Sequence, residues 1–275
     1  MRDLFDEKQG VAEAALIDAH VHIYPCFDPA RLFAAAQGHF DRAAEGFGLD
    51  KTVPGVLLLT ETAKDDVFSR LAEGDFTIPG WHMSRSEADP PVLWLRGGAG
   101  RDLALVAGRQ IITAERLEVL ALVTRRRFAD GRPLTEVLDE LHAADIPTIL
   151  PWALGKWTGG RGALVQSLLR ETPYPAFSLG DNGGRPRGWP SGRLLGRARQ
   201  LGIPVLPGSD PLPLRGAEIQ AGGYGFLLEA RLDHARFGEA LRQQLRHLRQ
   251  QLAVFGHRVS PLVALKDQVR LRIAR

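Results

Sequence analysis

The chain has 275 residues, of which 44% are hydrophobic and 24% charged, a composition typical of a globular protein, and its formal net charge is +3. No apolar run reaches the roughly 18 to 20 residues that a membrane helix needs, and no apolar segment follows the charged start "MRDLFDEKQG", so neither a membrane span nor a signal peptide is expected. The single cysteine, Cys26, cannot form an internal disulfide, which favours a reducing, cytoplasmic location.

Short apolar strands alternate with helical segments along most of the chain. The sequence predicts six strands that can run parallel, near residues 15, 54, 117, 147, 175 and 203. Such alternation predicts a parallel sheet covered by helices. We therefore expect an α/β fold, a distorted (β/α) TIM-like barrel, with a doubly wound open sheet as the alternative. No Gly-x-Gly-x-x-Gly or Walker loop supports a nucleotide-binding form of the open sheet.

Residues 76–116 interrupt this alternation. The stretch "VLWLRGGAGRDLALVAG" has two apolar runs around a Gly-rich turn, which is the pattern of a β-hairpin. We expect a β-hairpin insertion here, within a single domain that spans residues 1–275.

The C-terminal segment, residues 231–275, is predicted to be helical and basic. It carries ten basic and three acidic side chains, a net charge of +7, so the preceding 230 residues carry −4. A segment of this kind can bind nucleic acid or an acidic partner. However, apolar residues recur every three or four positions in "FGEALRQQLRHLRQQLAVF", which predicts a helix packed on the protein by one face. Nucleic acid is not an expected partner, because no aromatic residues alternate with the arginines.

The first predicted strand, "ALIDAHVHIYP", ends in an acid and two imidazoles at two-residue intervals, Asp18, His20 and His22. Residues two apart on a strand project from the same face, so the two histidines can bind one ion. Imidazole nitrogen is a common zinc ligand, and the carboxyl end of a barrel strand is where such folds place their chemistry. Asp18 is expected to accept a hydrogen bond behind the two ligands.

These residues carry a resemblance to a known family. "LIDAHVHIYP" resembles the first strand of the amidohydrolase superfamily of metal-dependent (β/α)8-barrel hydrolases, which ends in Asp-x-His-x-His or His-x-His. "VLPGSDPLP" is similar to the last strand of that superfamily, in which an Asp binds the metal and deprotonates the attacking water. The match implies this role for Asp210. The polymerase and histidinol phosphatase (PHP) barrels share the His-x-His start and are the second resemblance.

The sequence departs from that superfamily in its other metal ligands. The resemblance implies two further histidines after later strands and often a bridging lysine. None of the later predicted strands ends in histidine; the six remaining histidines lie in predicted helices, in the insertion or in the C-terminal region: His39, His82, His142, His234, His247 and His257. A site for one metal ion, or a site that has lost its metal, is therefore expected.

Two later strands are each followed by a Gly-rich turn that carries cations. Lys156 and Arg161 lie in "LPWALGKWTGGRG", and Arg185 and Arg187 lie in "SLGDNGGRPRGWP". Glycines let the backbone approach a ligand closely, and N–H groups at a helix start favour an anion. These turns predict a clamp for phosphate or carboxylate, in which we assign Lys156, Arg161 and Arg185 to the substrate; the alternative is a pair of solvated turns.

Three other residues have weaker functional patterns. Asp181 ends its strand and is a candidate metal ligand or an Asx turn over "DNGG". Glu61 ends the strand "GVLLLTE" and is a second candidate for the same face, although a helix cap or surface carboxylate is the simpler interpretation. Cys26 is expected to be an unreactive thiol, because the sequence shows no histidine partner for it.

Together these patterns predict a metal-dependent hydrolase that acts on a small anionic substrate through a metal-activated water. One divalent ion, expected to be zinc, would be bound by His20, His22 and Asp210, with Asp181 or Glu61 completing the shell, and Asp210 would accept the proton of the water. A PHP-like phosphoesterase is one alternative. A decayed barrel that acts as a binding or scaffold protein is the other, since such folds host many functions.

Overall fold

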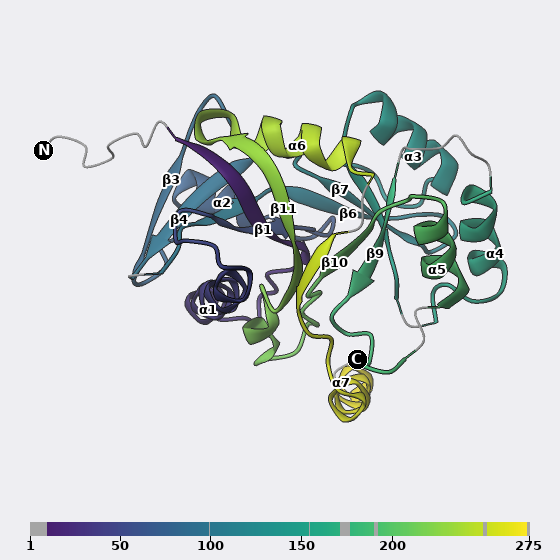
Figure 1. Ribbon diagram of the computed structural model, residues 1–275. Coiled ribbons are helices and arrows are strands. Elements are labelled where there is room, and N and C mark those ends of the chain that lie inside the picture. The colour runs from purple at the N-terminus through teal and green to yellow at the C-terminus, as the bar shows by residue number, and fades with distance from the viewer. Residues whose placement is uncertain are drawn as a thin grey trace, which may run out of the picture.

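Two mixed β-sheets lie at the centre of the computed structural model, which describes residues 10–98, 100–153, 155–170, 177–189, 192–249 and 252–273 (Figure 1). The N-terminal residues 1–9, where no signal peptide is expected, and four residues of the basic segment, 250–251 and 274–275, lie outside this description.

The first sheet has seven strands in the order β12-β11-β1-β2-β5-β4-β3. Its strands are β1 (Val11–Val21), β2 (Gly55–Leu59), β3 (Trp81–Arg85), β4 (Val92–Gly97), β5 (Leu103–Val106), β11 (Tyr224–Asp233) and β12 (Ala253–Gly256). The strands β1, β2 and β5 run parallel, whereas β11 runs antiparallel to β1, and β3, β4 and β5 form antiparallel pairs.

The second sheet has five strands in the order β10-β9-β8-β7-β6. Its strands are β6 (Gly108–Ile112), β7 (Glu118–Leu122), β8 (Thr148–Pro151), β9 (Ser178–Asn182) and β10 (Val205–Gly208). The strands β8, β9 and β10 run parallel, and β7 is antiparallel to both β6 and β8.

The expected TIM-like barrel is wrong. A TIM barrel has eight parallel strands, but both sheets here are mixed, and among the described residues neither sheet closes on itself. One cause is the tight turn between β6 and β7, which reverses the chain where a barrel would need a crossover helix. Another is β11, which occupies the edge of β1 in the antiparallel direction.

Two predicted segments also take a different place in the fold. The hairpin of residues 76–116 exists as β4 and β5, but β5 pairs with β2, so the hairpin extends the first sheet rather than standing apart from it. The C-terminal region is helical only in part, because β11 and β12 are strands. Its predicted amphipathic helix is α6 (Phe237–His247), which buries Phe237, Leu241 and Leu245.

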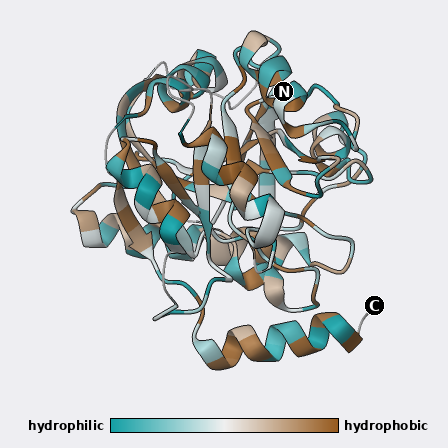
Figure 2. Cartoon of the chain, turned by 90° about the vertical axis from the view of Figure 1, so that its right-hand side faces the viewer, coloured by the Kyte–Doolittle hydropathy of each residue, from teal (hydrophilic) through white to brown (hydrophobic). Residues whose placement is uncertain are grey.

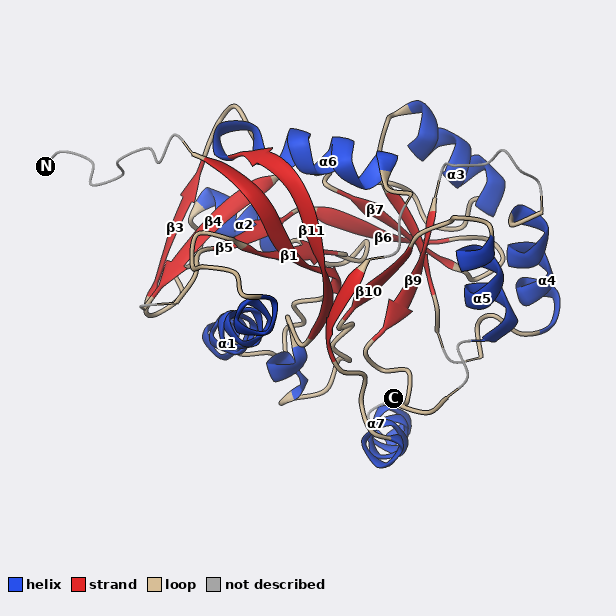
Figure 3. Cartoon of the chain, in the orientation of Figure 1, coloured by secondary structure: helices blue, strands red, loops and turns tan. Residues whose placement is uncertain are grey.

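Helices cover the sheets on their outer faces (Figure 3). The remaining ones are α1 (Pro29–Phe47), α2 (Val67–Glu73), α3 (Leu134–Ala143), α4 (Gly159–Leu168), α5 (Gly192–Gln200), α7 (Pro261–Ile273) and the short 3-10 helices η1 (Ala217–Gln220) and η2 (His234–Arg236). Helices α3, α4 and α5 bury apolar residues in a cluster against the second sheet. Figure 2 shows α7 below the rest of the chain, with Leu262 and Ile273 about four-fifths exposed at 80% and 81%.

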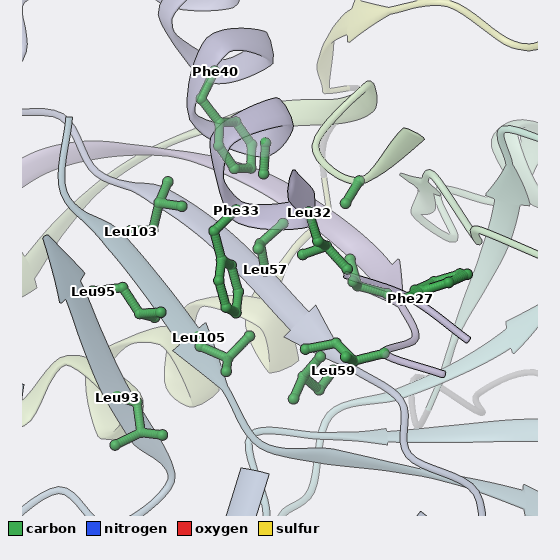
Figure 4. Close-up of a cluster of buried hydrophobic side chains, with 14 of the residues drawn as sticks. Phe27, Leu32, Phe33, Phe40, Leu57, Leu59, Leu93, Leu95, Leu103 and Leu105 are labelled. Atoms are coloured by element: carbon green, nitrogen blue, oxygen red, sulfur yellow. The ribbon is translucent and has the colours of Figure 1, made fainter. Parts of the chain in front are cut away.

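Helix α1 shows how the sequence builds the core beside the first sheet. Asp28 caps its N-terminus by accepting hydrogen bonds from the N–H groups of Ala30 and Arg31, and Gly48 ends it in the left-handed conformation. Its apolar residues recur at helical spacing, which places Phe33 and Phe40 on the sheet side. Figure 4 shows these rings among leucines of β2, β4 and β5.

The two sheets meet at the ends of β1 and β2. The N–H of Asp210, two residues after β10, donates to the carbonyl of His20 at 2.8 Å. On the other side, the N–H of Glu61 donates to the carbonyl of Gly108 at 3.2 Å. The carboxyl ends of β1 and β10 therefore lie side by side, which brings the ends of two distant chain segments to one place.

Helix length and hydropathy also bear on membranes. None of the helices in the described part of the chain combines the length and apolar character needed to cross a bilayer.

Candidate metal centre

His20 and His22 lie at the carboxyl end of β1, where the strand joins the two sheets. The strand alternation directs both rings to the same side, and both residues are buried. Their Nε2 atoms lie 3.0 Å apart. Two neutral imidazoles that face each other in this way can share one proton or bind one cation between them.

Asp210 reaches the same point from β10. It adopts a left-handed backbone conformation with φ of 47°, which asparagine and aspartate tolerate better than most residues. Its side chain is 19% exposed, and its Oδ1 lies 3.6 Å from Nε2 of His20 and 3.8 Å from Nε2 of His22. The backbone hydrogen bond to His20 fixes this position.

The close approach of β10 to β1 depends on a glycine. A Cβ atom on Gly208 would lie 2.5 Å from the backbone nitrogen of His20 and 2.6 Å from its Cβ, which is far inside van der Waals contact. The "GSD" sequence therefore combines the residue that lets the strands meet with the carboxylate that follows.

The three side-chain atoms form a triangle suited to one metal ion. Two ligand atoms bound at about 2.0 to 2.2 Å to a tetrahedral zinc ion lie roughly 3.3 to 3.5 Å apart. The observed separations of 3.0, 3.6 and 3.8 Å bracket that range. In the part of the chain that the structure describes, these three residues are the one group of His, Cys, Asp and Glu side chains with metal-binding proximity.

Burial also keeps the histidines in the form that binds a metal. Desolvation lowers the pKa of both His20 and His22 to about 4, so both rings are neutral near pH 7. Desolvation raises the pKa of Asp210, whereas the neighbouring His22 imidazole, the Lys156 ammonium and the hydrogen bond from Asn182 oppose that shift. The Nδ1 atom of His22 is buried without a hydrogen-bond partner among the described residues, so its ring orientation is set by packing.

Asp18 lies behind the cluster and holds the backbone of three segments together. Its Oδ1 accepts hydrogen bonds from the N–H groups of His20 and Ser209, at 3.2 and 2.8 Å, and its Oδ2 accepts one from Gly222 at 2.8 Å. Burial raises its pKa to about 7 against the effect of these hydrogen bonds. Asp18 thus accepts its hydrogen bonds from backbone N–H groups and positions the backbone around the cluster.

Asn182, which the sequence analysis did not select, holds the other side of Asp210. Its Nδ2 donates to Oδ2 of Asp210 at 2.9 Å and to the carbonyl of Trp152 at 2.7 Å. The amide thus occupies Oδ2, while Oδ1 of Asp210 faces the two histidines. Strand alternation could have found it: Leu179 packs under the helices, so Asp181 shares its face and Asn182 points the other way.

Asp181 does not join the metal-binding group. Arg185 donates to both of its carboxylate oxygens, at 2.6 and 2.5 Å, and Tyr224 donates to Oδ2 at 3.0 Å. All three residues are buried. The pair Asp181–Arg185 is therefore a buried ion pair between the end of β9 and the turn that follows it, in which the charge of Arg185 is neutralised. The hydrogen bond from Tyr224 ties Asp181 to the start of β11.

The cations of the first Gly-rich turn lie in two different settings. Lys156 is 33% exposed and forms an ion pair with Glu118, the first residue of β7. Both charges act on the pKa of His20, so this pair borders the cluster. Arg161 is partly exposed and donates to the carbonyl of Gly155 within its own turn. Glu118 was missed because β7 was expected to run parallel, which would have placed its first residue at the opposite edge.

Two other candidates lie outside the cluster. Glu61 forms a buried ion pair with Arg109 at 2.8 Å and accepts a hydrogen bond from the N–H of Phe68, in the first turn of the helix α2. Cys26 is a free, exposed thiol. Neither residue belongs to the group formed by the two histidines and Asp210.

Comparisons with known proteins support the fold but give no family. No protein-family model and no curated protein matches this sequence. Among solved structures, the chain is similar to PsfC from Pseudomonas syringae PB-5123, with 16% sequence identity and a TM-score of 0.57 over 96% of this chain and 100% of that chain. This match and the two mixed sheets contradict the resemblance to the amidohydrolase and PHP barrels, because neither sheet forms the parallel barrel that both families require.

Proposed function

We propose that this protein is a metal-dependent hydrolase that binds one divalent ion through His20, His22 and Asp210. The observation that carries the proposal is the buried triangle of two Nε2 atoms and one carboxylate oxygen, from two segments almost 190 residues apart in sequence. Two imidazoles and a carboxylate form a donor set typical of catalytic zinc, in which a further position stays open for water or substrate.

The residues around the ion have distinct roles in this proposal. A bound divalent ion lowers the pKa of its water toward 7 and polarises the bond to be cleaved. His20 and His22, neutral because they are buried, hold the ion. Asp210 accepts the proton that the water loses, and the raised pKa of its carboxyl makes it a stronger base. Asn182 keeps this carboxylate oriented.

The substrate class follows from the charges beside the cluster. Lys156 is close enough to act electrostatically on both His20 and Asp210, and its ammonium is partly exposed. We assign it the anionic part of a small substrate. Lys156 is itself paired with Glu118 but stays partly exposed, whereas Arg185 is buried against Asp181 and Arg161 donates within its own turn, so these two arginines are left out of the role. We place the activity in the cytoplasm, because the chain has one cysteine and forms no internal disulfide.

The proposal is tested by turnover of a panel of small amides, lactones and phosphoesters, measured on metal-free protein and after addition of zinc. Asp210→Asn should retain the fold and lose roughly 10² to 10⁴ in rate, the usual contribution of a positioned general base. The double variant His82→Ala/His142→Ala is the matched control, because it removes two exposed histidines outside the cluster. Metal-loaded protein that turns over none of these classes would contradict the hydrolase assignment.

A further inference from the structure

A second cavity lies at the same edge of the sheets, between α1, η1, the start of β11 and the end of β12. Its volume is about 570 Å³, within the range of pockets that hold small organic ligands. None of the three proposed metal-binding residues lines it. The side chains that matter for its chemistry are the basic His39, Arg42 and His257 and the apolar Ile219, Phe255 and Val259.

The charge of this cavity is one-sided. Among the described residues that line it, none is an aspartate or a glutamate. Arg42 makes no ion pair within the described part of the chain, in contrast to Arg31, the other arginine of α1, which pairs with Glu218. A guanidinium at a cavity wall without a carboxylate partner is a ready donor for an oxyanion.

The histidine of α1 has a defined orientation at this wall. Nδ1 of His39 lies 2.9 Å from the carbonyl of Ala221 and donates to it, which leaves Nε2 as the free ring nitrogen. Burial and the nearby charge of Arg42 lower the pKa of His39. With Nδ1 donating to Ala221, Nε2 of the neutral ring is a hydrogen-bond acceptor, so Arg42 is the side chain that can donate to an anion here.

Two glycines form part of the cavity wall. Gly256 has a φ of 72°, and a Cβ atom there would lie 2.0 Å from the carbonyl oxygen of Gly223. A Cβ atom on Gly223 would in turn lie 2.8 Å from the carbonyl oxygen of Gln220. The two glycines therefore let backbone segments approach closely at the wall of the cavity that Phe255 and Arg42 also line.

We propose that this cavity binds a small organic anion, in which a carboxylate or phosphate group is carried on a compact apolar body. The oxyanion accepts hydrogen bonds from Arg42 on the side of the cavity that His257 also lines, and the apolar body packs on Phe255, Ile219 and Val259. The inference does not depend on the proposed hydrolase, because the two sites share none of their binding side chains.

Isothermal titration calorimetry on the full-length, metal-free protein tests this site. The probes are benzoate and phenyl phosphate as apolar anions, inorganic phosphate as an anion without the body, and benzyl alcohol as a body without the charge, all at one ionic strength. We expect benzoate or phenyl phosphate to bind more tightly than inorganic phosphate or benzyl alcohol. Arg42→Ala should weaken that binding roughly tenfold or more, the effect of losing a charged hydrogen bond.

Three variants make the result specific. His257→Ala removes an exposed imidazole from the rim and should also weaken binding. Arg197→Ala removes the same charge from an exposed position on α5, away from the cavity, and should leave binding unchanged. The double variant His20→Ala/His22→Ala should bind the probes as the wild type does. Failure of both apolar anions to bind, equal binding by wild type and Arg42→Ala, or loss of binding in the His20/His22 double variant would each overturn the proposal.

Discussion

Replacing Gly208 by alanine should disrupt the metal centre although all three of its ligand residues are kept. The added Cβ would lie 2.5 Å from the backbone nitrogen of His20 and 3.0 Å from its Cα. Because carbon contacts prefer about 3.5 to 4.0 Å, β10 must move away from β1 by about 1 Å. That movement would stretch the 2.8 Å hydrogen bond from Asp210 to His20 beyond the normal range.

The cost of this movement can be estimated. Overpacking costs about 1 to 3 kcal/mol, and the lost hydrogen bond adds about 1 kcal/mol, so the melting temperature should fall by roughly 5 °C or more. Metal affinity should fall about tenfold or more, as when groups that orient ligands are altered. Gly196→Ala is the control, because its Cβ meets no atom within 4 Å in α5 and helix propensity favours alanine. The reasoning is refuted if Gly208→Ala matches the wild type in both thermal unfolding and zinc titration.

Three further perturbations test the surroundings of the centre. Asp18→Asn presents an amide donor to a backbone N–H and should lower the free energy of unfolding by about 1 to 3 kcal/mol in urea; no change would contradict its bridging role. Arg185→Met leaves the buried Asp181 without its ion-pair partner and should lower the free energy of unfolding by about 3 to 5 kcal/mol. A neutral or stabilising result would show that the ion pair is dispensable. His20 and His22 have a lower pKa in the folded, metal-free protein than in the unfolded chain, so the unfolded state binds more protons as pH falls from about 6.5 to about 4. The free energy of unfolding should therefore drop across that window, and it should drop less in the variant His20→Ala/His22→Ala. An equal dependence of unfolding free energy on pH in the two proteins would contradict the assignment.

The sequence predicted the positions of most strands but not their directions. Segments near residues 15, 54, 117, 147, 175 and 203 are all strands, because short apolar runs are a local signal. Direction depends on pairing between distant segments. The segment near residue 117 runs antiparallel, and β11 was missed because only its first half is fully buried. The parallel barrel expected from the alternation therefore did not form.

The part of the metal centre that lies on one strand could be predicted from the sequence. His20 and His22 share a face by strand geometry alone, and the structure brings Asp210 to them. Asp181 and Arg185 were harder to interpret, since four-residue spacing after a strand is equally consistent with a ligand, a clamp or the ion pair that they form. The alternation of β9 indicates on which face Asn182 lies, whereas the place of Glu118 depends on the direction of β7, which the sequence pattern leaves undetermined.

The metal content of the purified protein tests the central claim most directly. Protein prepared without a histidine tag, incubated with one equivalent of zinc and desalted, is measured by elemental analysis beside His20→Ala/His22→Ala and the control His82→Ala/His142→Ala. The triangle of His20, His22 and Asp210 predicts about one ion per chain in the wild type and the control, and none in the His20/His22 variant. Equal metal content in the wild type and the His20/His22 variant would contradict the account.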